Sequence, residues 1–169
     1  AISISHAGVR LAERVVGGLR DARVTLVGAG EAGQLVAKAL QSKGVVDLRV
    51  TNRTHSRAQE VTRQLGGRAV PFAGLGEQVS DSDVVIAATE APEYVVTLDM
   101  VASAKTRRNG GLMLLDLSVP RNVDPEVAEL DGVRLFNIDD LSSIAEENLK
   151  GRRTAAKAAA EIVEEEATR

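Results

Sequence analysis

The stretch TLVGAGEAG, residues Thr25–Gly33, decides the fold. Its three glycines, Gly28, Gly30 and Gly33, have the spacing G-x-G-x-x-G between a short apolar run and a helical pattern. In such a strand–turn–helix unit the first glycine permits a tight turn, the second lets a pyrophosphate approach the backbone, and the third lets the helix pack on the strand. The stretch predicts a dinucleotide site at a helix N-terminus, and the alternative is a purely structural turn.

The whole turn is expected to surround the phosphates. The predicted contacts come from backbone groups of Gly28, Ala29, Gly30, Glu31, Ala32 and Gly33. Glu31 is unusual in a phosphate-facing turn. We expect its carboxylate to point outward, where it also suits the positive end of the helix.

The end of the second predicted strand indicates which dinucleotide binds. NAD sites carry Asp or Glu there, about 20 residues past the glycines, to bond the ribose 2′-hydroxyl. This chain instead has Asn52, followed by Arg53, Thr54 and, three residues later, Arg57. Two guanidinium groups suit a 2′-phosphate, so NADPH is predicted. The alternative is a solvated helix start, with Thr54 as its cap and both arginines in water.

Outward from this turn, strand and helix patterns alternate along the chain. Strands are expected at 23–28, 47–52, 68–72, 83–89, 112–119 and 133–138. Helices are expected at about 5–16 (N-cap Ser5, stop at Gly17), 31–44, 55–67, 75–79 and 97–108 (capped by Thr97). Alternation of this kind predicts an α/β fold with a doubly wound, mostly parallel sheet, the Rossmann fold, in the order 3-2-1-4-5-6.

The chain from Asp139 onward has a different composition, rich in Ala, Glu, Lys and Arg, with apolar residues three to four positions apart. A helix of about 28 residues within it would span about 42 Å, more than a small domain covers. It is either a frayed terminal helix or a connector to another domain. We therefore expect a nucleotide-binding domain at 1–140 and the start of a long connecting helix at 141–169.

Composition bounds the function. The 169 residues fit one domain, and with 44 % hydrophobic but only 2 % aromatic residues the core must be aliphatic. A net charge of −3 argues against a broad nucleic-acid-binding face. The absence of cysteine excludes disulfides and thiol chemistry within the chain. Neither of the two histidines belongs to a catalytic triad or a metal-binding cluster. No catalytic or metal-binding residue is therefore predicted. No apolar run is long enough for a membrane span, so we expect a cytoplasmic domain without membrane contact.

Two further stretches follow predicted strands at the sheet edge where ligands bind in open α/β folds. They are AATEAP (Ala87–Pro92) and DLSVPRNVDP (Asp116–Pro125). Their backbone groups are candidates to line the nicotinamide half of a cofactor. Asp116 is either a ligand contact or a loop organiser, and Arg121 either a contact or a surface charge.

Taken together, these motifs resemble one family, the glutamyl-tRNA reductases, in their NADPH-binding domain. The matching stretches are SISHAGVRLA, VTLVGAGEAGQLVAKAL, VTNRTHSRAQEV, DVVIAATEAP, LMLLDLSVPRNVDPEV and LFNIDDLSSIAEENLKGRR. They occur in the family's order and cover nearly the whole chain. DLSVPRNVDP and the pattern DDL…N…R are much more specific than the glycine turn.

The resemblance implies an activity and roles for residues. The family reduces glutamyl-tRNA to glutamate-1-semialdehyde, the entry to tetrapyrrole (haem and chlorophyll) biosynthesis. The resemblance places the pyrophosphate at Gly28, Gly30 and Gly33, and the ribose phosphate at Asn52, Arg53, Thr54 and Arg57. The nicotinamide would lie near Ala88, Thr89, Leu117, Ser118, Val119 and Pro120.

The family's other parts are a catalytic domain with an essential cysteine and a dimerisation domain on a long spinal helix. The resemblance implies a homodimer and a downstream aminomutase as a partner. Because this chain has no cysteine, we interpret it as the excised middle domain, able to bind NADPH but inactive alone. Two alternatives stay open: a shikimate-dehydrogenase-like NADP domain, which also has an Asn-Arg-Thr turn, and a non-catalytic dinucleotide sensor that associates through its terminal helix.

Overall fold

The structure is a computed structural model that describes residues 3–105 and 111–144. The strands in these ranges are β1 (Arg23–Val27), β2 (Asp47–Thr51), β3 (Arg68–Ala69), β4 (Val84–Ala87), β5 (Leu112–Asp116) and β6 (Val133–Asn137). The helices are α1 (Ile4–Val16), α2 (Glu31–Ser42), α3 (His55–Leu65), α4 (Leu75–Ser80) and α5 (Leu98–Lys105), with short 3-10 helices η1 (Phe72–Gly74) and η2 (Pro125–Glu129).

All neighbouring strands are parallel, and their order is β3-β2-β1-β4-β5-β6. The predicted Rossmann topology is therefore confirmed. The order reverses between β1 and β4, whose last residues Val27 and Ala87 are in register. A crevice for a ligand opens at such a switch point, on the carboxyl side of the strands.

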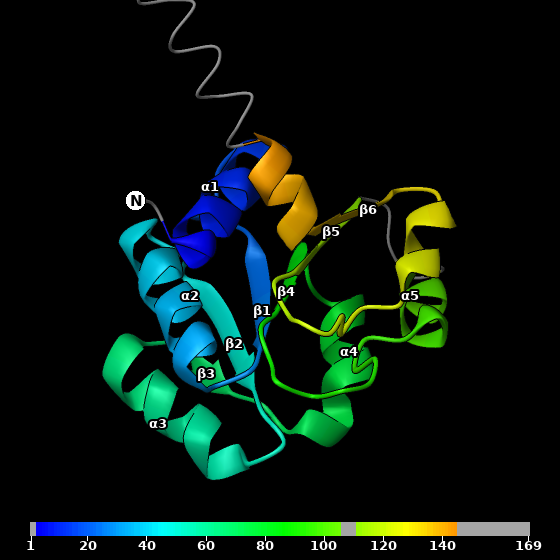
Figure 1. The fold of residues 1–169 in the computed structure, drawn as a ribbon. Helices are drawn as coiled ribbons and strands as arrows, with labels where there is room; N and C mark the ends of the chain where they lie inside the picture. Colours follow the sequence, from blue (N-terminus) through cyan, green and yellow to red (C-terminus); the bar gives the residue numbers. More distant parts are fainter. Residues whose placement is uncertain (1–2, 106–110, 145–169) are drawn as a thin grey trace, which may run out of the picture. The chain divides into compact units, whose positions relative to one another are not determined.

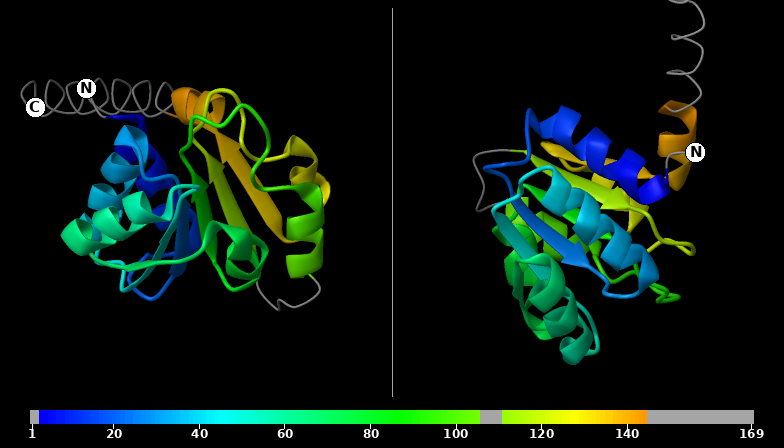
Figure 2. Two further views of the ribbon diagram at one scale, coloured as in Figure 1. Left: turned by 90° about the horizontal axis from the view of Figure 1, so that it is seen from below. Right: turned by 90° about the vertical axis from the view of Figure 1, so that its left-hand side faces the viewer.

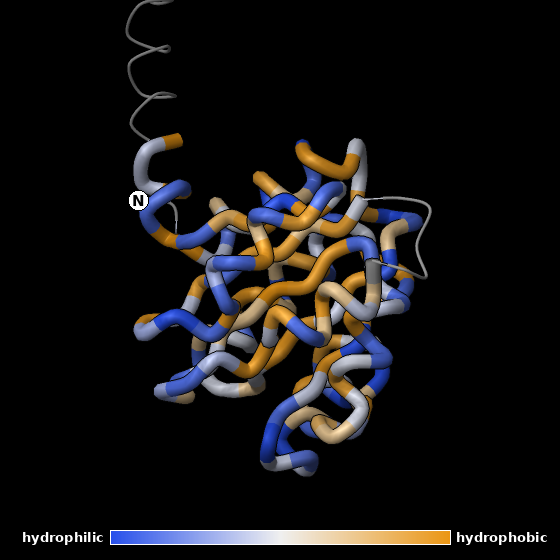
Figure 3. The backbone as a smooth tube through the Cα atoms, turned by 90° about the vertical axis from the view of Figure 1, so that its right-hand side faces the viewer, coloured by the Kyte–Doolittle hydropathy of each residue, from blue (hydrophilic) through white to orange (hydrophobic). Residues whose placement is uncertain are grey.

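The helices form one layer on each face of the sheet. Helices α1, α2 and α3 cover one face, and α4 and α5 cover the other (Figures 1 and 2). Hydrophobic segments run through the middle of the fold, and hydrophilic ones gather at the outer turns (Figure 3). Strands β4 and β5 are buried along their whole length, which explains their near-continuous apolar sequences.

The N-cap of helix α1 lies two residues before the predicted one. Ser5 was expected to be the N-cap, but it lies inside the helix and is buried. Ser3 is the N-cap instead: its backbone is extended, and its Oγ accepts a hydrogen bond from the N–H of His6 at 3.2 Å. A residue with helical backbone angles cannot direct its hydroxyl to the free N–H groups of the first turn. The predicted stop at Gly17 is confirmed, with a left-handed φ of 75°.

All six strands are shorter than predicted, and the difference is largest for β3, β4 and β5. Strand β3 ends at Ala69, shortly before Pro71, which has no N–H for the ladder. Strand β5 ends at Asp116 rather than Val119, because the chain turns there around the Asp116 carboxylate. The predicted cap of α5 is confirmed, since Thr97 Oγ1 accepts the N–H of Met100 at 3.3 Å.

The long C-terminal helix was predicted from Asp139 onward. Residues 138–144 are helical, and the rest of that prediction lies outside the described residues. By its internal contacts the chain divides into residues 1–138 and 139–169, and the six-stranded sheet lies in the first unit.

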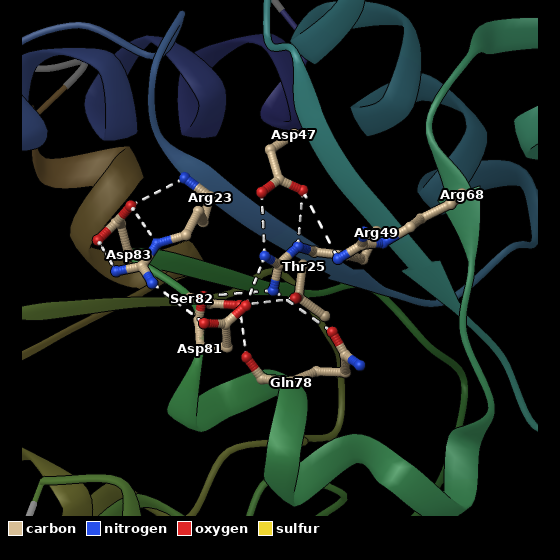
Figure 4. A network of polar contacts seen from close by, with 9 residues as sticks. All are labelled: Arg23, Thr25, Asp47, Arg49, Arg68, Gln78, Asp81, Ser82 and Asp83. Atoms are coloured by element: carbon tan, nitrogen blue, oxygen red, sulfur yellow. Dashed lines mark hydrogen bonds and ion pairs between the residues drawn. The ribbon is translucent and has the colours of Figure 1, made fainter. Parts of the chain in front are cut away.

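A polar cluster, here the amino-edge network, joins the starts of the strands on the α4 side (Figure 4). Its members are Arg23, Thr25, Asp47, Arg49, Arg68, Gln78, Asp81, Ser82 and Asp83. Arg49 lies in its centre and is 1 % exposed. Its guanidinium donates to both carboxylate oxygens of Asp47 (2.9 and 3.0 Å) and to Asp81 Oδ2 (2.7 Å).

These hydrogen bonds shift the proton affinities of their partners. The pKa of Asp47 lies below its usual value because its carboxylate accepts hydrogen bonds from Arg49. The pKa of Arg49 is raised by the same hydrogen bonds. Arg23 bonds Asp83 and Asp81 in the same way at the start of β1. The charges of this edge are therefore neutralised within the protein.

Candidate cofactor-binding site

Two glycines of the turn after β1 are enclosed by backbone. Gly28 has a φ of 123°, and a Cβ there would lie 2.2 Å from the carbonyl oxygen of Ala88. A Cβ on Gly33 would lie 2.2 Å from the carbonyl oxygen of Gly28. Both distances are far below van der Waals contact. The expected tight turn at Gly28 and the close helix packing at Gly33 are thus confirmed.

Gly30 has the opposite surroundings. A Cβ there would meet no atom of the described residues within 4 Å, and its φ of −82° is open to any residue. Gly30 is the N-cap of α2 and provides no side chain to accept hydrogen bonds from the first turn. The N–H groups of Glu31, Ala32 and Gly33 have no acceptor within the helix. A backbone cradle of this kind fits a pyrophosphate.

A pocket of about 370 Å³ lies beside this cradle. One wall is the glycine turn and the start of α2, from Ala29 to Glu31 with Gln34, and the other is α3, including Arg57 and Glu60. Arg57 is exposed, and within the described part of the chain it has no ion pair. The lining therefore combines helix N–H groups that have no acceptor in α2, the guanidinium of Arg57, and the carboxyl groups of Glu31 and Glu60.

Asn52 connects the glycine turn to the turn after β2. Its Oδ1 accepts the N–H of Ala29 at 3.2 Å, and its Nδ2 donates to the carbonyl oxygen of Thr54 at 3.0 Å. Thr54 occupies the N-cap position of α3, but its side chain makes no capping hydrogen bond. The expected cap position of Thr54 is confirmed, and both Arg53 and Arg57 are exposed, so the alternative of a solvated helix start stays open. An ionised Asp or Glu at position 52 could not donate the hydrogen bond to the Thr54 carbonyl, because a carboxylate only accepts hydrogen bonds.

The structure separates the two arginines that were expected to act together. Arg57 lines the pocket beside the glycine turn. Arg53 instead lies over the ring of Phe72, 5.5 Å from the ring centroid, and forms an ion pair with Glu93. Residue separation alone suggested a shared target, but the side chains point to different neighbours.

The residues predicted to contact the nicotinamide lie on the loops after β4 and β5, and hydrogen bonds connect these two loops. The N–H of Thr89 donates to Ser118 Oγ at 3.1 Å, and the N–H of Leu117 donates to Ala87 at 2.9 Å. Ala88, Leu117 and Ser118 are buried, whereas Val119 is 75 % exposed. Of this group, Val119 offers the most open surface at the carboxyl edge.

Asp116 organises the loop after β5. It is 1 % exposed and accepts the backbone N–H groups of Ser118, Asn122 and Val123 at 2.8–3.1 Å. The loop-organiser interpretation is confirmed. Arg121 is half-buried, and its role as a ligand contact stays a prediction.

Sequence reasoning missed Asn122, Phe72 and Glu93. Asn122 is fully buried, accepts from Thr89 Oγ1, and donates to the carbonyls of Ala91 (3.0 Å) and Glu93 (3.2 Å). It thereby fixes the loop after β4 to the loop after β5. A polar residue beside apolar Val123 in a loop already singled out was the available signal; Phe72 and Glu93 had none, because their partner Arg53 lies in another segment.

Within residues 3–105 and 111–144, no group of three His, Asp or Glu side chains is placed to hold a metal ion. The same residues contain no helix long and apolar enough to cross a membrane.

Comparisons with known proteins agree with this geometry. Residues 10–144 match the family model described as shikimate / quinate 5-dehydrogenase. The glutamyl-tRNA reductase of Desulfovibrio desulfuricans is 44 % identical over 167 residues, which is 98 % of this chain and 39 % of that protein. The same enzyme of Archaeoglobus fulgidus is 46 % identical, over 98 % of this chain and 38 % of its own length.

Among solved structures, glutamyl-tRNA reductase from Methanopyrus kandleri matches with a TM-score of 0.82 and 44 % identity, over 94 % of this chain and 40 % of that one. Shikimate 5-dehydrogenase from Thermus thermophilus, in complex with NADP(H) and shikimate, matches with a TM-score of 0.58 over 81 % of this chain and 51 % of that one. Its 23 % identity shows a shared fold alone.

The chain spans about two fifths of the length of the curated relatives that it matches. It therefore belongs to the family of the shikimate / quinate 5-dehydrogenase model, and over nearly its whole length it is similar to one part of the glutamyl-tRNA reductases.

Proposed function

We propose that this chain is the NADPH-binding domain of a glutamyl-tRNA reductase. The observation that carries the proposal is the start of α2, where Gly30 leaves the backbone open beside the free guanidinium of Arg57. Asn52, in place of an acid at the end of β2, favours a 2′-phosphate over a free 2′-hydroxyl. Residues 1–140 form the cofactor domain in this proposal, and residues 141–169 begin the connecting helix.

Each part of NADPH has proposed partners. The backbone of Gly28, Ala29, Gly30, Glu31, Ala32 and Gly33 receives the pyrophosphate, and Asn52, Arg53, Thr54 and Arg57 surround the adenosine ribose phosphate. Ala88, Thr89, Leu117, Ser118 and Val119 lie beside the nicotinamide. When bound, NADPH supplies a hydride; the residues of this chain bind and orient it.

The remaining chemistry belongs to the whole protein. The hydride would reduce the glutamyl group of glutamyl-tRNA to glutamate-1-semialdehyde, after attack by a cysteine thiolate outside this chain. The 169 residues contain no cysteine, so the chain alone should bind NADPH without turnover. A homodimer, an aminomutase that receives the product, and a cytoplasmic location complete the proposal.

Calorimetric titration with NADPH and NADH tests the cofactor. We expect tighter binding of NADPH, and replacement Arg57→Ala or Arg53→Ala should weaken it by about 1–3 kcal/mol through lost hydrogen bonds to a charged group. Binding of NADH should stay nearly unchanged. The matched control is Arg63→Ala, an exposed arginine later on α3. NADH binding as tightly as NADPH would contradict the proposal.

The two alternatives make different predictions. A shikimate-dehydrogenase-like domain would share the cofactor, but curated relatives at 41–46 % identity are glutamyl-tRNA reductases. A dinucleotide sensor would change its oligomeric mass when NADPH is added. Light scattering with and without NADPH separates it from the proposed domain, whose mass should not change.

A further inference from the structure

The guanidinium of Arg53 makes two contacts within the protein, one through its face and one through an N–H group at its edge. The face of its guanidinium lies over Phe72, with 5.5 Å between Cζ and the ring centroid. Its Nη2 forms the ion pair with Glu93 Oε1. Both side chains are about half exposed, 56 % for Arg53 and 49 % for Glu93, so a solute can reach the pair.

The ion pair connects loops of strands that are not neighbours. Arg53 follows β2 and Glu93 follows β4, and β1 lies between these strands. The pair therefore bridges the carboxyl edge around the end of β1, where the turn at Gly28 begins. A dinucleotide with its pyrophosphate on this turn and its ribose at Asn52 would compete for the same guanidinium.

The position of Glu93 is set by the fold. Its carbonyl accepts a hydrogen bond from the Nδ2 of Asn122 at 3.2 Å, and Asn122 is fully buried. The N–H of Asn122 is in turn bound to Asp116 at 2.8 Å. Glu90 lies on the same loop and is also exposed, but within the described residues it forms no ion pair. The contact with Arg53 is thus specific to one carboxylate of this loop.

We propose that Glu93 is a specificity-determining residue of the cofactor site, whose carboxylate competes with the ribose 2′-phosphate for the Arg53 guanidinium. The inference rests on the proposed function. A phosphate carries more charge and more acceptor oxygens than a carboxylate, so it can displace Glu93. A free 2′-hydroxyl cannot, and NADH then leaves the ion pair intact. Glu93 therefore lowers the affinity for NADPH and keeps Arg53 neutralised when no 2′-phosphate is present.

The test is a set of titrations with NADPH and NADH on the 169-residue chain. An exposed ion pair is worth up to about 1 kcal/mol, so Glu93→Gln should tighten NADPH binding about two- to fivefold and change NADH binding less than about 1.5-fold. Glu90→Gln removes the same charge from the same loop and should change neither. In an Arg53→Ala background, Glu93→Gln should have no effect, because the competition is gone.

Three outcomes would overturn the role of Glu93: no gain for NADPH in Glu93→Gln, an equal gain in Glu90→Gln, or a gain that persists without Arg53. Each of them can occur while the wild-type chain still prefers NADPH, and then the proposed cofactor stands. A wild-type chain that prefers NADH would overturn both. Glu93→Gln removes the same exposed ion pair from the unbound protein, so its free energy of unfolding should fall by no more than about 1 kcal/mol, and an unfolding curve within that limit confirms that the variant is folded.

Discussion

Arg49 and Arg57, at opposite edges of the sheet, have opposite surroundings. At the amino edge, the guanidinium of Arg49 is buried and bonded to Asp47 and Asp81 (Figure 4). At the carboxyl edge, Arg57 is exposed without an ion pair in the described part of the chain, next to helix N–H groups that have no acceptor in α2. A charge satisfied inside the protein stabilises the fold, whereas donors without a protein acceptor are available to a ligand.

The glycines of the turn repeat this contrast within a few residues. Gly28 and Gly33 are enclosed by backbone atoms, and Gly30 faces open space. The first two are required by the fold and the third by the proposed ligand. Substitutions of Arg49 or Gly28 should therefore lower stability, whereas substitutions of Arg57 or Gly30 should weaken cofactor binding and leave stability nearly unchanged.

The largest effect is expected from Gly28→Ala. Its Cβ would clash with Ala88 at a φ that side chains rarely adopt, so the free energy of unfolding should fall by more than about 3 kcal/mol. Gly30→Ala should cost less than about 1 kcal/mol yet weaken NADPH binding at least about tenfold, by filling the cradle. Urea denaturation and calorimetry measure the two quantities. Equal stability of the two variants would contradict the distinction.

The next largest effect is expected from Arg49→Ala. The change leaves the carboxylates of Asp47 and Asp81 without their buried partner, and we expect a loss of about 2–4 kcal/mol in the free energy of unfolding. The Kd for NADPH should not change, because the site lies at the other edge. Arg68→Ala is the control: its guanidinium is exposed and 3.9 Å from Asp47, so the loss should stay below about 0.5 kcal/mol.

A smaller effect on the free energy of unfolding is expected when the pH is lowered and Asp47 becomes protonated. The folded-state pKa of Asp47 is depressed by the hydrogen bonds from Arg49, so this carboxylate contributes stability above its unfolded pKa of about 4 and loses it as pH falls through the lower folded value. Because Asp47 is partly exposed, the contribution is about 0.5–1 kcal/mol. Asp47→Asn should be less stable than the wild type at pH 7 and approach it at pH 3, as measured by urea midpoints. A difference that is constant with pH would exclude this linkage.

The smallest effect on stability is expected from Arg57→Ala. An exposed side chain without an ion pair in the described residues should change the free energy of unfolding by less than about 0.5 kcal/mol. Urea denaturation measures it beside Arg49→Ala. A loss as large as that of Arg49→Ala would show that Arg57 also stabilises the fold, and would contradict the contrast between the two arginines.

Much of the fold could be predicted because its signals are local. The strand–turn–helix at Gly28, the buried apolar runs of β4 and β5, and the stop at Gly17 all follow from backbone and burial requirements of neighbouring residues. The errors occurred where two local options were close, as between Ser3 and Ser5 at the start of α1. The end of β5 was misplaced because Asp116 turns the chain through partners six and seven residues away.

The candidate site divides in the same way. The sequence by itself determined the glycine turn, the missing acid at Asn52 and the family, since each depends on residue types at fixed spacings. Only the tertiary structure decided that Arg57 faces the pocket while Arg53 lies over Phe72 and pairs with Glu93. The long, flexible arginine side chain is positioned by the rings and carboxylates that loops distant in sequence bring close to it. The spacing of residues along the chain therefore does not predict where the guanidinium lies.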